Sequence, residues 1–299
     1  MTFDSIRIAA RTLRKQPVFA SVVVVSLALA IALNTTMYGV LDALIHPRID
    51  AHAPGQLYTI TFYGDYKFHV SNVERDSLVR EGMRTYQAIT RLEGAFGRGK
   101  TVQAGAQIAN AVVAGVASNY FDVLGAHAVQ GRTFVHADET SGVQPVVISQ
   151  PIADVLFPHG DSPIGRVVEI DGAPHAVIGV VSRYASLPGY GTGVWIPTQP
   201  QRDVMYTRVI RIRDGVTRAE AERELQTVAD RIVAAGGPGS GPAAFRLHSV
   251  VDPDFQFRGF HLAIVLAVVA VLLVACSNLA NIQLARGITR RRELALRSA

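Results

Sequence analysis

Eight residues of this 299-residue chain match the spacing of a phosphate-binding loop. The segment Gly94–Thr101, GAFGRGKT, places Lys100 and Thr101 directly after its last glycine. Such a loop binds phosphate only where it joins a buried strand to the N-terminus of a helix, because the helix supplies the N–H donors. The residues that follow, VQAGAQIANAVVAGV, are rich in glycine and β-branched residues and predict strands. We therefore expect a glycine-rich turn here, and neither a nucleotide nor another cofactor.

Residues that could bind a metal or act as nucleophiles are scattered along the chain. The nine histidines include no HExxH pattern, and the closest group of ligand types is His136, Asp138 and Glu139, which we expect in a solvated loop. No GxSxG motif is present. The single cysteine, Cys276, lies in an apolar stretch and excludes an intrachain disulfide. These observations predict no metal, no catalytic residue and no enzyme.

Three amide side chains lie within or near the ends of long apolar stretches: Asn34, Asn278 and Asn281. Amides in membrane helices often bind neighbouring helices, so these residues are candidates for helix packing. That interpretation requires further membrane helices, from a partner or from a continuation of the chain. The alternative is that the three amides lie at the membrane–water interface.

The elements that carry these amides are two uncharged stretches near the ends of the chain. The first runs from Gln16 to Leu41, a length of 26 residues, or about 39 Å as a helix. The second runs from Gly259 to Ala285, and its centre, Leu262 to Ala275, is apolar throughout. A hydrocarbon core about 30 Å thick needs about 20 such residues, so we predict transmembrane helices over 17–41 and 259–285.

The charges that flank the two stretches predict their orientation. Residues 1–16 hold four bases and one acid, and residues 286–299 hold five bases and one acid. The flanks therefore carry +3 and +4, and the chain's total of +5 leaves −2 for the remainder. Because positive flanks stay in the cytoplasm, both termini are predicted to be cytoplasmic, with the middle outside the cell (inner or plasma) membrane. The basic excess indicates topology and membrane lipid, and no nucleic acid.

The N-terminal segment has a pattern of its own. Residues 1–16 place apolar side chains at helical spacing with arginines on another face, which predicts an amphipathic helix on the cytoplasmic membrane surface. A signal peptide cleaved after Ala28-Leu29-Ala30 is the alternative for the first stretch. Cleavage would leave the location of the middle domain unchanged.

The middle of the chain, residues 42–258, predicts an α+β domain with a β-rich insertion at about 95–200. Asp171-Gly172 between two alternating segments predicts a β-hairpin. Thr217 with Glu220 predicts a capping box that opens a helix ending near Ala235. Further predicted elements are strands at 56–63, 143–149, 205–213 and 244–250, and helices at 70–88, 118–124 and 151–156.

Several segments together resemble MacB/FtsX-type ABC transporter permeases. Near the C-terminus an N-x-x-N…LAR…R-x-x-E-x-A-x-R pattern is formed by Asn278, Asn281, Leu284, Ala285, Arg286, Arg290, Glu293, Ala295 and Arg297. In the middle, SNYFDVLGAHAVQGRTF, VVISQPIADVLFP, PIGRVVEIDGAPHAVIGVV and VIRIRDGVTRAEAERELQTVADRI resemble successive blocks of the MacB-like periplasmic core domain. Each block is weak alone, but all are collinear over nearly the whole chain.

The resemblance implies a membrane protein whose two transmembrane helices flank an extracytoplasmic domain with a porter-like α/β part. It implies a permease subunit that couples ATP hydrolysis by a separate cytoplasmic ABC ATPase to movement of the outer domain, in efflux or mechanotransmission, with room for a periplasmic partner. Residues 286–299 then form a coupling segment, and the chain is expected to stop inside it, as in a truncated member of the large duplicated permeases. Its candidate ATPase-coupling or membrane-anchor residues are Arg286, Arg290, Arg291, Arg292, Glu293 and Arg297.

Two function hypotheses remain open at the level of the sequence. A permease predicts that two further membrane spans follow in the full gene. A two-span receptor, with an outer domain that senses a ligand, predicts a helical signalling module instead. The transported substrate or ligand cannot be derived from these residue patterns.

Overall fold

The computed structural model divides the chain into two compact units, one of residues 47–255 and one that combines residues 1–46 with 256–299. The described residues of the first unit are 48–63, 81–93, 99–140, 144–199, 206–235 and 244–251. Those of the second unit are parts of 21–42 and of 262–280, and they are helical. Among the described residues, no helix combines the length and the apolar character needed to cross a bilayer. The two transmembrane helices stay predictions.

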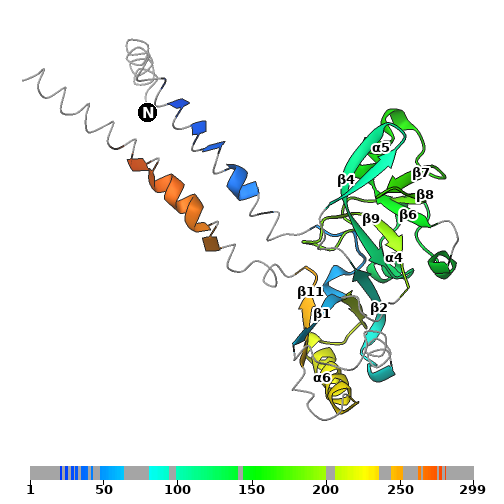
Figure 1. Cartoon of the computed structure of the whole chain (residues 1–299). Coiled ribbons are helices and arrows are strands. Elements are labelled where there is room, and N and C mark those ends of the chain that lie inside the picture. Colours follow the sequence, from blue (N-terminus) through cyan, green and yellow to red (C-terminus); the bar gives the residue numbers. More distant parts are fainter. Residues whose placement is uncertain are drawn as a thin grey trace, which may run out of the picture. The chain divides into compact units, whose positions relative to one another are not determined.

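Four antiparallel strands and a long helix form one part of the α+β unit (Figure 1). These elements are β1 (Leu57–Tyr63), β2 (Tyr86–Glu93), β10 (Tyr206–Ile212), β11 (Ala244–Ser249) and α6 (Arg218–Ala235). The strand order is β11–β1–β10–β2. Alternate strand positions supply buried apolar side chains, such as Ile89 and Ile210, that pack with Leu225 and Val228 of α6.

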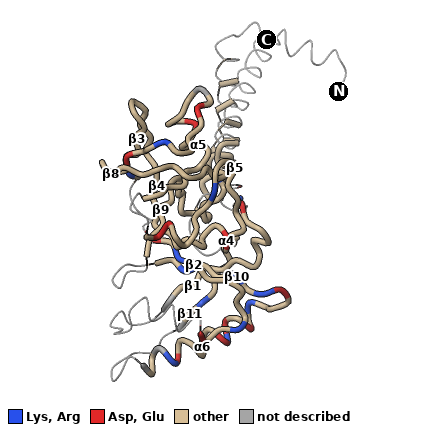
Figure 2. Tube along the Cα trace, turned by 90° about the vertical axis from the view of Figure 1, so that its right-hand side faces the viewer, with Lys and Arg blue, Asp and Glu red and all other residues tan. Residues whose placement is uncertain are grey.

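The face of α6 that points away from this core carries charges of both signs (Figure 2). Arg218 and Glu222, four residues apart, form an ion pair of 3.1 Å between Nε and Oε1. Such mixed charge is typical of a helix face exposed to water. The helix therefore covers the sheet with one face and contacts solvent with the other.

Six further strands close into a ring, because β9 pairs with β4 as well as with β6. They are β3 (Lys100–Ala104), β4 (Gln107–Val116), β6 (Pro145–Ser149), β7 (Val167–Ile170), β8 (Ala173–Val181) and β9 (Thr192–Pro197). Strand β5 (Ala128–Gly131) adds to the edge of β8, and helix α5 (Gln150–Leu156) follows β6 directly. Buried valines of the ring pack with Ala153 and Leu156 of α5.

Strand β4 joins the two parts, because its last residues pair with β2. Beside this junction lies helix α4 (Tyr120–Leu124), and the largest buried side chain of the unit, Trp195, packs edge-on against Phe121 with ring centroids 5.6 Å apart. One shared core therefore holds the junction together.

Three short 3-10 helices are also present among the described residues: η1 (Pro54–Gln56), η2 (His136–Thr140) and η3 (Pro158–Gly160).

Two local predictions are confirmed by backbone geometry. Asp171 and Gly172 join β7 to β8 with φ angles of 50° and 83°, the left-handed pair that a tight hairpin turn requires. The capping box is also formed, because the Thr217 N–H donates to Glu220 Oε2 at 2.8 Å and the Glu220 N–H donates to Thr217 Oγ1 at 3.3 Å.

The predicted helix over residues 70–88 is wrong at its C-terminal end. Residues 81–82 are helical, but β2 begins at Tyr86 and pairs along its length with β10. Pairing with a neighbouring strand outweighs the local helical pattern here. Residues 64–80 lie outside the described part of the chain, as do 94–98 of the glycine-rich motif.

Candidate functional site

Every candidate coupling and packing residue lies outside the described part of the chain. This applies to Arg286, Arg290, Arg291, Arg292, Glu293, Arg297, Asn34, Asn278 and Asn281. Their roles stay predictions. The described residues instead show how the α+β unit holds the chain segments that lead to the two predicted spans.

The phosphate-loop-like motif continues into a strand. Lys100 and Thr101 are the first residues of β3, which pairs with β4, and the Lys100 ammonium lies 2.8 Å from Asp171 Oδ2. Phosphate-binding loops instead lead into a helix whose first N–H groups point at the ligand. The geometry from Gly99 onward is thus that of a strand start, with its lysine in a surface ion pair.

The three ligand-type residues near 136–139 do not converge on one point: Asp138 binds Arg132, while His136 Nδ1 lies 3.7 Å from Glu139 Oε2. Asp138 accepts two hydrogen bonds from Arg132, of 2.6 and 2.9 Å, which lower the pKa of its carboxyl. Glu139 Oε1 accepts from the Ser118 N–H at 2.9 Å, while His136 is 93% exposed. Within the described residues, no three His, Cys, Asp or Glu side chains form a group that could hold a metal ion.

Arg211 of β10 is a buried arginine that binds the C-terminal end of helix α4. Its Nε donates to the carbonyl of Val123 at 3.0 Å and its Nη2 donates to the carbonyl of Leu124 at 3.1 Å. These are the last carbonyls of α4, which have no partner inside the helix. The side chain is 6% exposed, and burial lowers its pKa. Arg211 therefore caps the C-terminus of α4 from a neighbouring strand.

The same guanidinium also binds the segment that follows the first predicted span. Arg211 Nη1 lies 3.4 Å from the Ala53 carbonyl and 3.4 Å from Gln56 Oε1. Ala53 has a φ of 43°, a left-handed conformation that costs a non-glycine residue about 1 kcal/mol or more. The hydrogen bonds of Arg211 thus hold residues 53–56 in a conformation that local preferences disfavour.

A second contact ties this segment to α4. The His52 N–H donates to the Leu124 carbonyl at 3.0 Å. Gly125, with φ at 68°, ends α4, and a Cβ at this glycine would lie 2.6 Å from the Cβ of His52. Glycine is therefore required here both for the turn and for the close approach of the linker.

The segments that lead to the two predicted spans leave from neighbouring strands. Residues 48–56 precede β1, residues 250–255 follow β11, and the two strands are antiparallel with Tyr58 opposite Ser249. The Val250 N–H also donates to the Leu57 carbonyl at 3.0 Å. The start of one segment and the end of the other are thus hydrogen-bonded side by side, and Arg211 joins the first to the centre of the sheet.

Sequence reasoning missed Arg211. The signal was an arginine in the alternating strand 206–212, on the same face as buried Val209. A charged residue at an inward position of a strand needs several partners, but the partners lie 87 to 158 positions away and leave no local pattern.

Comparison with known proteins matches residues 20–228 to the family model described as MacB-like periplasmic core domain. A macrolide export ATP-binding/permease protein MacB 2 from Yersinia pestis bv. Antiqua (strain Antiqua) is 32% identical over 133 residues, 41% of this chain and 19% of that relative. A second protein of this strain, MacB 1, is 26% identical over 237 residues, 75% of this chain and 36% of the relative. The aligned parts thus span a fifth to about a third of these relatives.

A solved structure has the same fold. A domain of a permease protein from Porphyromonas gingivalis has a TM-score of 0.52 at 14% sequence identity, and the match covers 67% of this chain and 93% of that domain. At this identity, the likeness shows the α+β fold alone.

Proposed function

The chain belongs to the MacB-like periplasmic core domain family, and from this we propose that it is the permease subunit of an ABC transporter. In this proposal a partner ABC ATPase hydrolyses ATP in the cytoplasm, and the membrane helices transmit its closure to the α+β unit outside. The chain itself carries out no covalent chemistry. Its task is to convert movement of helices into movement of a folded domain.

The proposal rests on the pairing of β1 with β11, the strands at which the segments to the two predicted spans begin. Because these strands are hydrogen-bonded neighbours in one sheet, a relative shift of the two helices would act on a single rigid edge. Arg211 would transmit a displacement of residues 48–56, the linker from the first predicted span to β1, to α4 and β10. Rigid hydrogen-bonded elements are what such transmission requires.

Exposed apolar side chains of the second unit support the two membrane helices. Leu29 and Leu273 are 69% and 64% exposed, and they belong to helical residues within 17–41 and 259–285. Many large apolar side chains exposed around a helix call for a non-aqueous environment. We therefore place the protein in the inner or plasma membrane, with both termini cytoplasmic and the α+β unit outside.

Residues 286–299 are proposed to contact the ATPase and the headgroups of anionic lipids. Arginines suit both roles, because a guanidinium binds carboxylates and phosphates through two parallel hydrogen bonds. Further membrane helices, from a second copy or another segment, would complete the translocation unit around the three asparagine amides.

Purification with the partner ATPase tests the proposal. The tagged chain, isolated from the membranes of its own host, is expected to bring an ABC ATPase with it, and this ATPase is expected to hydrolyse ATP when the complex is placed in nanodiscs. Reversing three charges (Arg290→Glu, Arg291→Glu and Arg292→Glu) should lower the recovered ATP hydrolysis at least about tenfold, because like charges would face an acidic contact.

The matched control is Arg246→Glu, a charge reversal at an exposed position of β11. This variant should keep the associated ATPase activity, since it lies in the α+β unit. A chain that purifies without any ABC ATPase, or a triple variant that hydrolyses ATP like the unchanged protein, would contradict the proposed coupling.

A further inference from the structure

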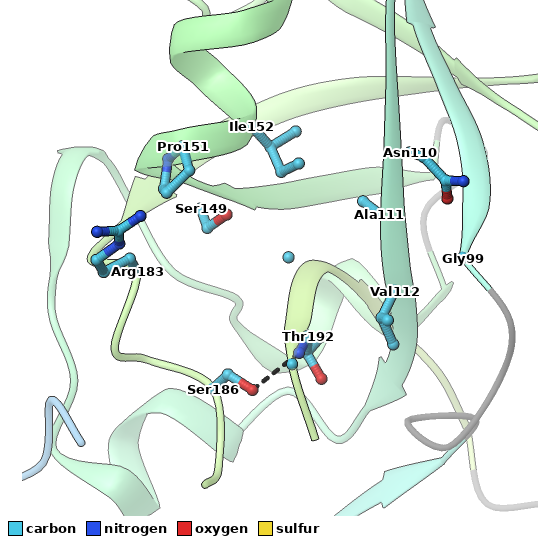
Figure 3. Close-up of a pocket in the computed structure, with 12 residues that line it drawn as sticks. Gly99, Asn110, Ala111, Val112, Ser149, Pro151, Ile152, Arg183, Ser186 and Thr192 are labelled. Carbon is cyan, nitrogen blue, oxygen red and sulfur yellow. Dashed lines mark hydrogen bonds between the residues drawn. The ribbon is translucent and has the colours of Figure 1, made fainter. Parts of the chain in front are cut away.

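A cavity of about 400 Å³ lies beside the start of α5 in the six-stranded ring (Figure 3). Its walls come from Gly99 ahead of β3, from β4, the β6–α5 junction, the β8–β9 loop and the start of β9. The volume lies within the range of about 300–1,000 Å³ that small-molecule sites occupy.

The lining of the cavity carries one positive charge and no acidic residue. The charge belongs to Arg183, an exposed residue of the β8–β9 loop, and among the described residues no carboxylate forms an ion pair with it. The hydroxyl of Tyr184 accepts hydrogen bonds from Arg48 and Arg183, which lower its pKa. A phenol is a neutral partner, so the guanidinium charge stays available to an anion.

One hydroxyl of the lining has no hydrogen-bond partner among the described residues, and a second makes no capping bond. Ser149 is 4% exposed, and at the N-cap position of α5 it makes no side-chain capping bond. Thr192 is also 4% exposed, and its Oγ1 has no hydrogen-bond partner in the part of the chain that the structure describes. By contrast, Ser186 Oγ accepts from the Thr192 N–H at 2.9 Å and donates to the Leu187 carbonyl at 3.2 Å. Buried hydroxyls without protein partners point to water or a ligand.

The opposite side of the cavity is formed by apolar groups and by the amide of Asn110. Figure 3 shows Arg183, Pro151 and Ser149 along one wall and Val112 with Ala111 along the other. Gly193 lies between the walls, where a Cβ would be 3.1 Å from Ile152 Cγ1 and 3.5 Å from Ala111 Cβ. The absence of a side chain at Gly193 therefore lets Ile152 pack closely here and keep its place in the cavity wall.

We propose that this cavity binds a small molecule or a chain end that carries one carboxylate next to an aliphatic group. Arg183 binds the carboxylate, with Ser149 as a further donor, and the aliphatic group packs on Ile152 and Val112. A single carboxylate matches the single positive charge of the lining, and its two oxygens match the planar guanidinium.

The site adjoins the linker to the first predicted span. The Asp50 N–H donates to the Tyr184 carbonyl at 2.7 Å, one residue from Arg183. The inference deepens the proposed function by naming a ligand class, and it rests on that function only for the ligand's role in transport.

Photolabelling of the full chain in nanodiscs tests the site. The probe is N-acetyl-photoleucine, a leucine analogue with a free carboxylate and a diazirine in its aliphatic side chain. After irradiation, mass spectrometry should locate the label in residues 107–116 or 149–157. The methyl amide of the probe, which lacks the charge, should label these peptides about tenfold less, because it cannot form a charge-assisted hydrogen bond with the guanidinium.

Variants separate the site from general adsorption. Arg183→Gln should lower labelling of these peptides about tenfold, and Gly193→Val should lower it by displacing the Ile152 side chain on which the aliphatic group packs. Arg166→Gln, which removes another exposed arginine of the ring, should leave it unchanged. The fluorescence of Trp195, the only tryptophan of the chain, verifies that each variant is folded. Label in the predicted spans, residues 17–41 and 259–285, serves as an internal reference for probe that has dissolved in the membrane.

A tetrapeptide that ends in photoleucine distinguishes the two sources of the carboxylate. Labelling by this peptide at lower concentration than the free probe identifies a chain end, and labelling by the free probe alone identifies a small acid. Equal labelling by the acid and its amide, or labelling that is unchanged in Arg183→Gln, would overturn the proposal. No step needs ATP, so failure of ATPase coupling and failure of this site are separate results.

Discussion

Arg211→Gln is expected to lower the free energy of unfolding of the α+β unit by about 2–4 kcal/mol. The shorter amide reaches at most part of the set of acceptors that Arg211 binds, so the buried carbonyl of Val123 loses its donor and that of Leu124 keeps only the His52 N–H. Each buried carbonyl left without a partner costs about 1–3 kcal/mol. The left-handed conformation of Ala53 also loses a bond that holds it.

Thermal unfolding followed by Trp195 fluorescence measures this effect in the full chain. A loss of 1 kcal/mol lowers the Tm of a unit of this size by about 2–4 °C. The control is Arg213→Gln, since Arg213 lies at the exposed end of the same segment and donates to the Arg84 carbonyl at 2.8 Å. Hydrogen exchange should also become faster at the His52 amide in Arg211→Gln. An unchanged Tm together with unchanged exchange at His52 would show that Arg211 does not clamp the linker.

Trp195→Ala should cost about 3–5 kcal/mol, because it opens a cavity at the junction of the two strand systems. The Trp195 side chain is fully buried, and its ring packs edge-on against Phe121. It pairs across strands with Ala114 of β4 and Val147 of β6, so its loss would affect the closure of the ring at β9.

Pulse proteolysis in urea measures this second effect, since the variant lacks the fluorescent side chain. Trp195→Phe serves as the control, because it keeps an aromatic ring against Phe121 and removes a smaller volume. We expect it to lose less than half as much stability as Trp195→Ala. Equal urea midpoints for the alanine variant and the unchanged protein would mean that the junction does not depend on this side chain.

Local chemistry in the sequence was sufficient to predict several elements. Asp171-Gly172 specified its turn because both residues tolerate positive φ, and Thr217 with Glu220 specified a helix start because their side chains bind each other's backbone. Gly125 likewise ends α4 in a left-handed conformation, where a helix stop was expected. In each case the interacting residues lie within a few positions of one another, so the local sequence pattern predicts the interaction.

Long-range pairings could not be predicted in this way. The ring closes through parallel pairing of β4 with β9, which places Val113 opposite Val194, and no turn residue encodes that register. The Arg211 clamp joins residues as far apart as Ala53 and Arg211. The start of strand β2 was predicted to be helical, because charged residues that favour a helix precede it. Its pairing with β10, which is distant in sequence, makes it a strand.

The cavity beside α5 was also outside the reach of pattern analysis. Its residues come from five segments, and only the assembled ring places Arg183 opposite Val112. Sequence spacing predicted a turn at the glycine-rich motif nearby, most of which lies outside the described residues, and did not predict the cavity that Gly99 helps to line.

The central claim is that the α+β unit and the two termini lie on opposite sides of the membrane. In a Cys276→Ser background, single cysteines at Ser5, Asp161 and Ser298 would be treated with a membrane-impermeant maleimide in intact spheroplasts. Asp161, an exposed residue after η3, should be labelled at once when it is replaced by cysteine. The Ser5→Cys and Ser298→Cys variants should be labelled only after the membrane is permeabilised. Labelling of Ser298→Cys in intact spheroplasts, or protection of Asp161→Cys, would contradict the account.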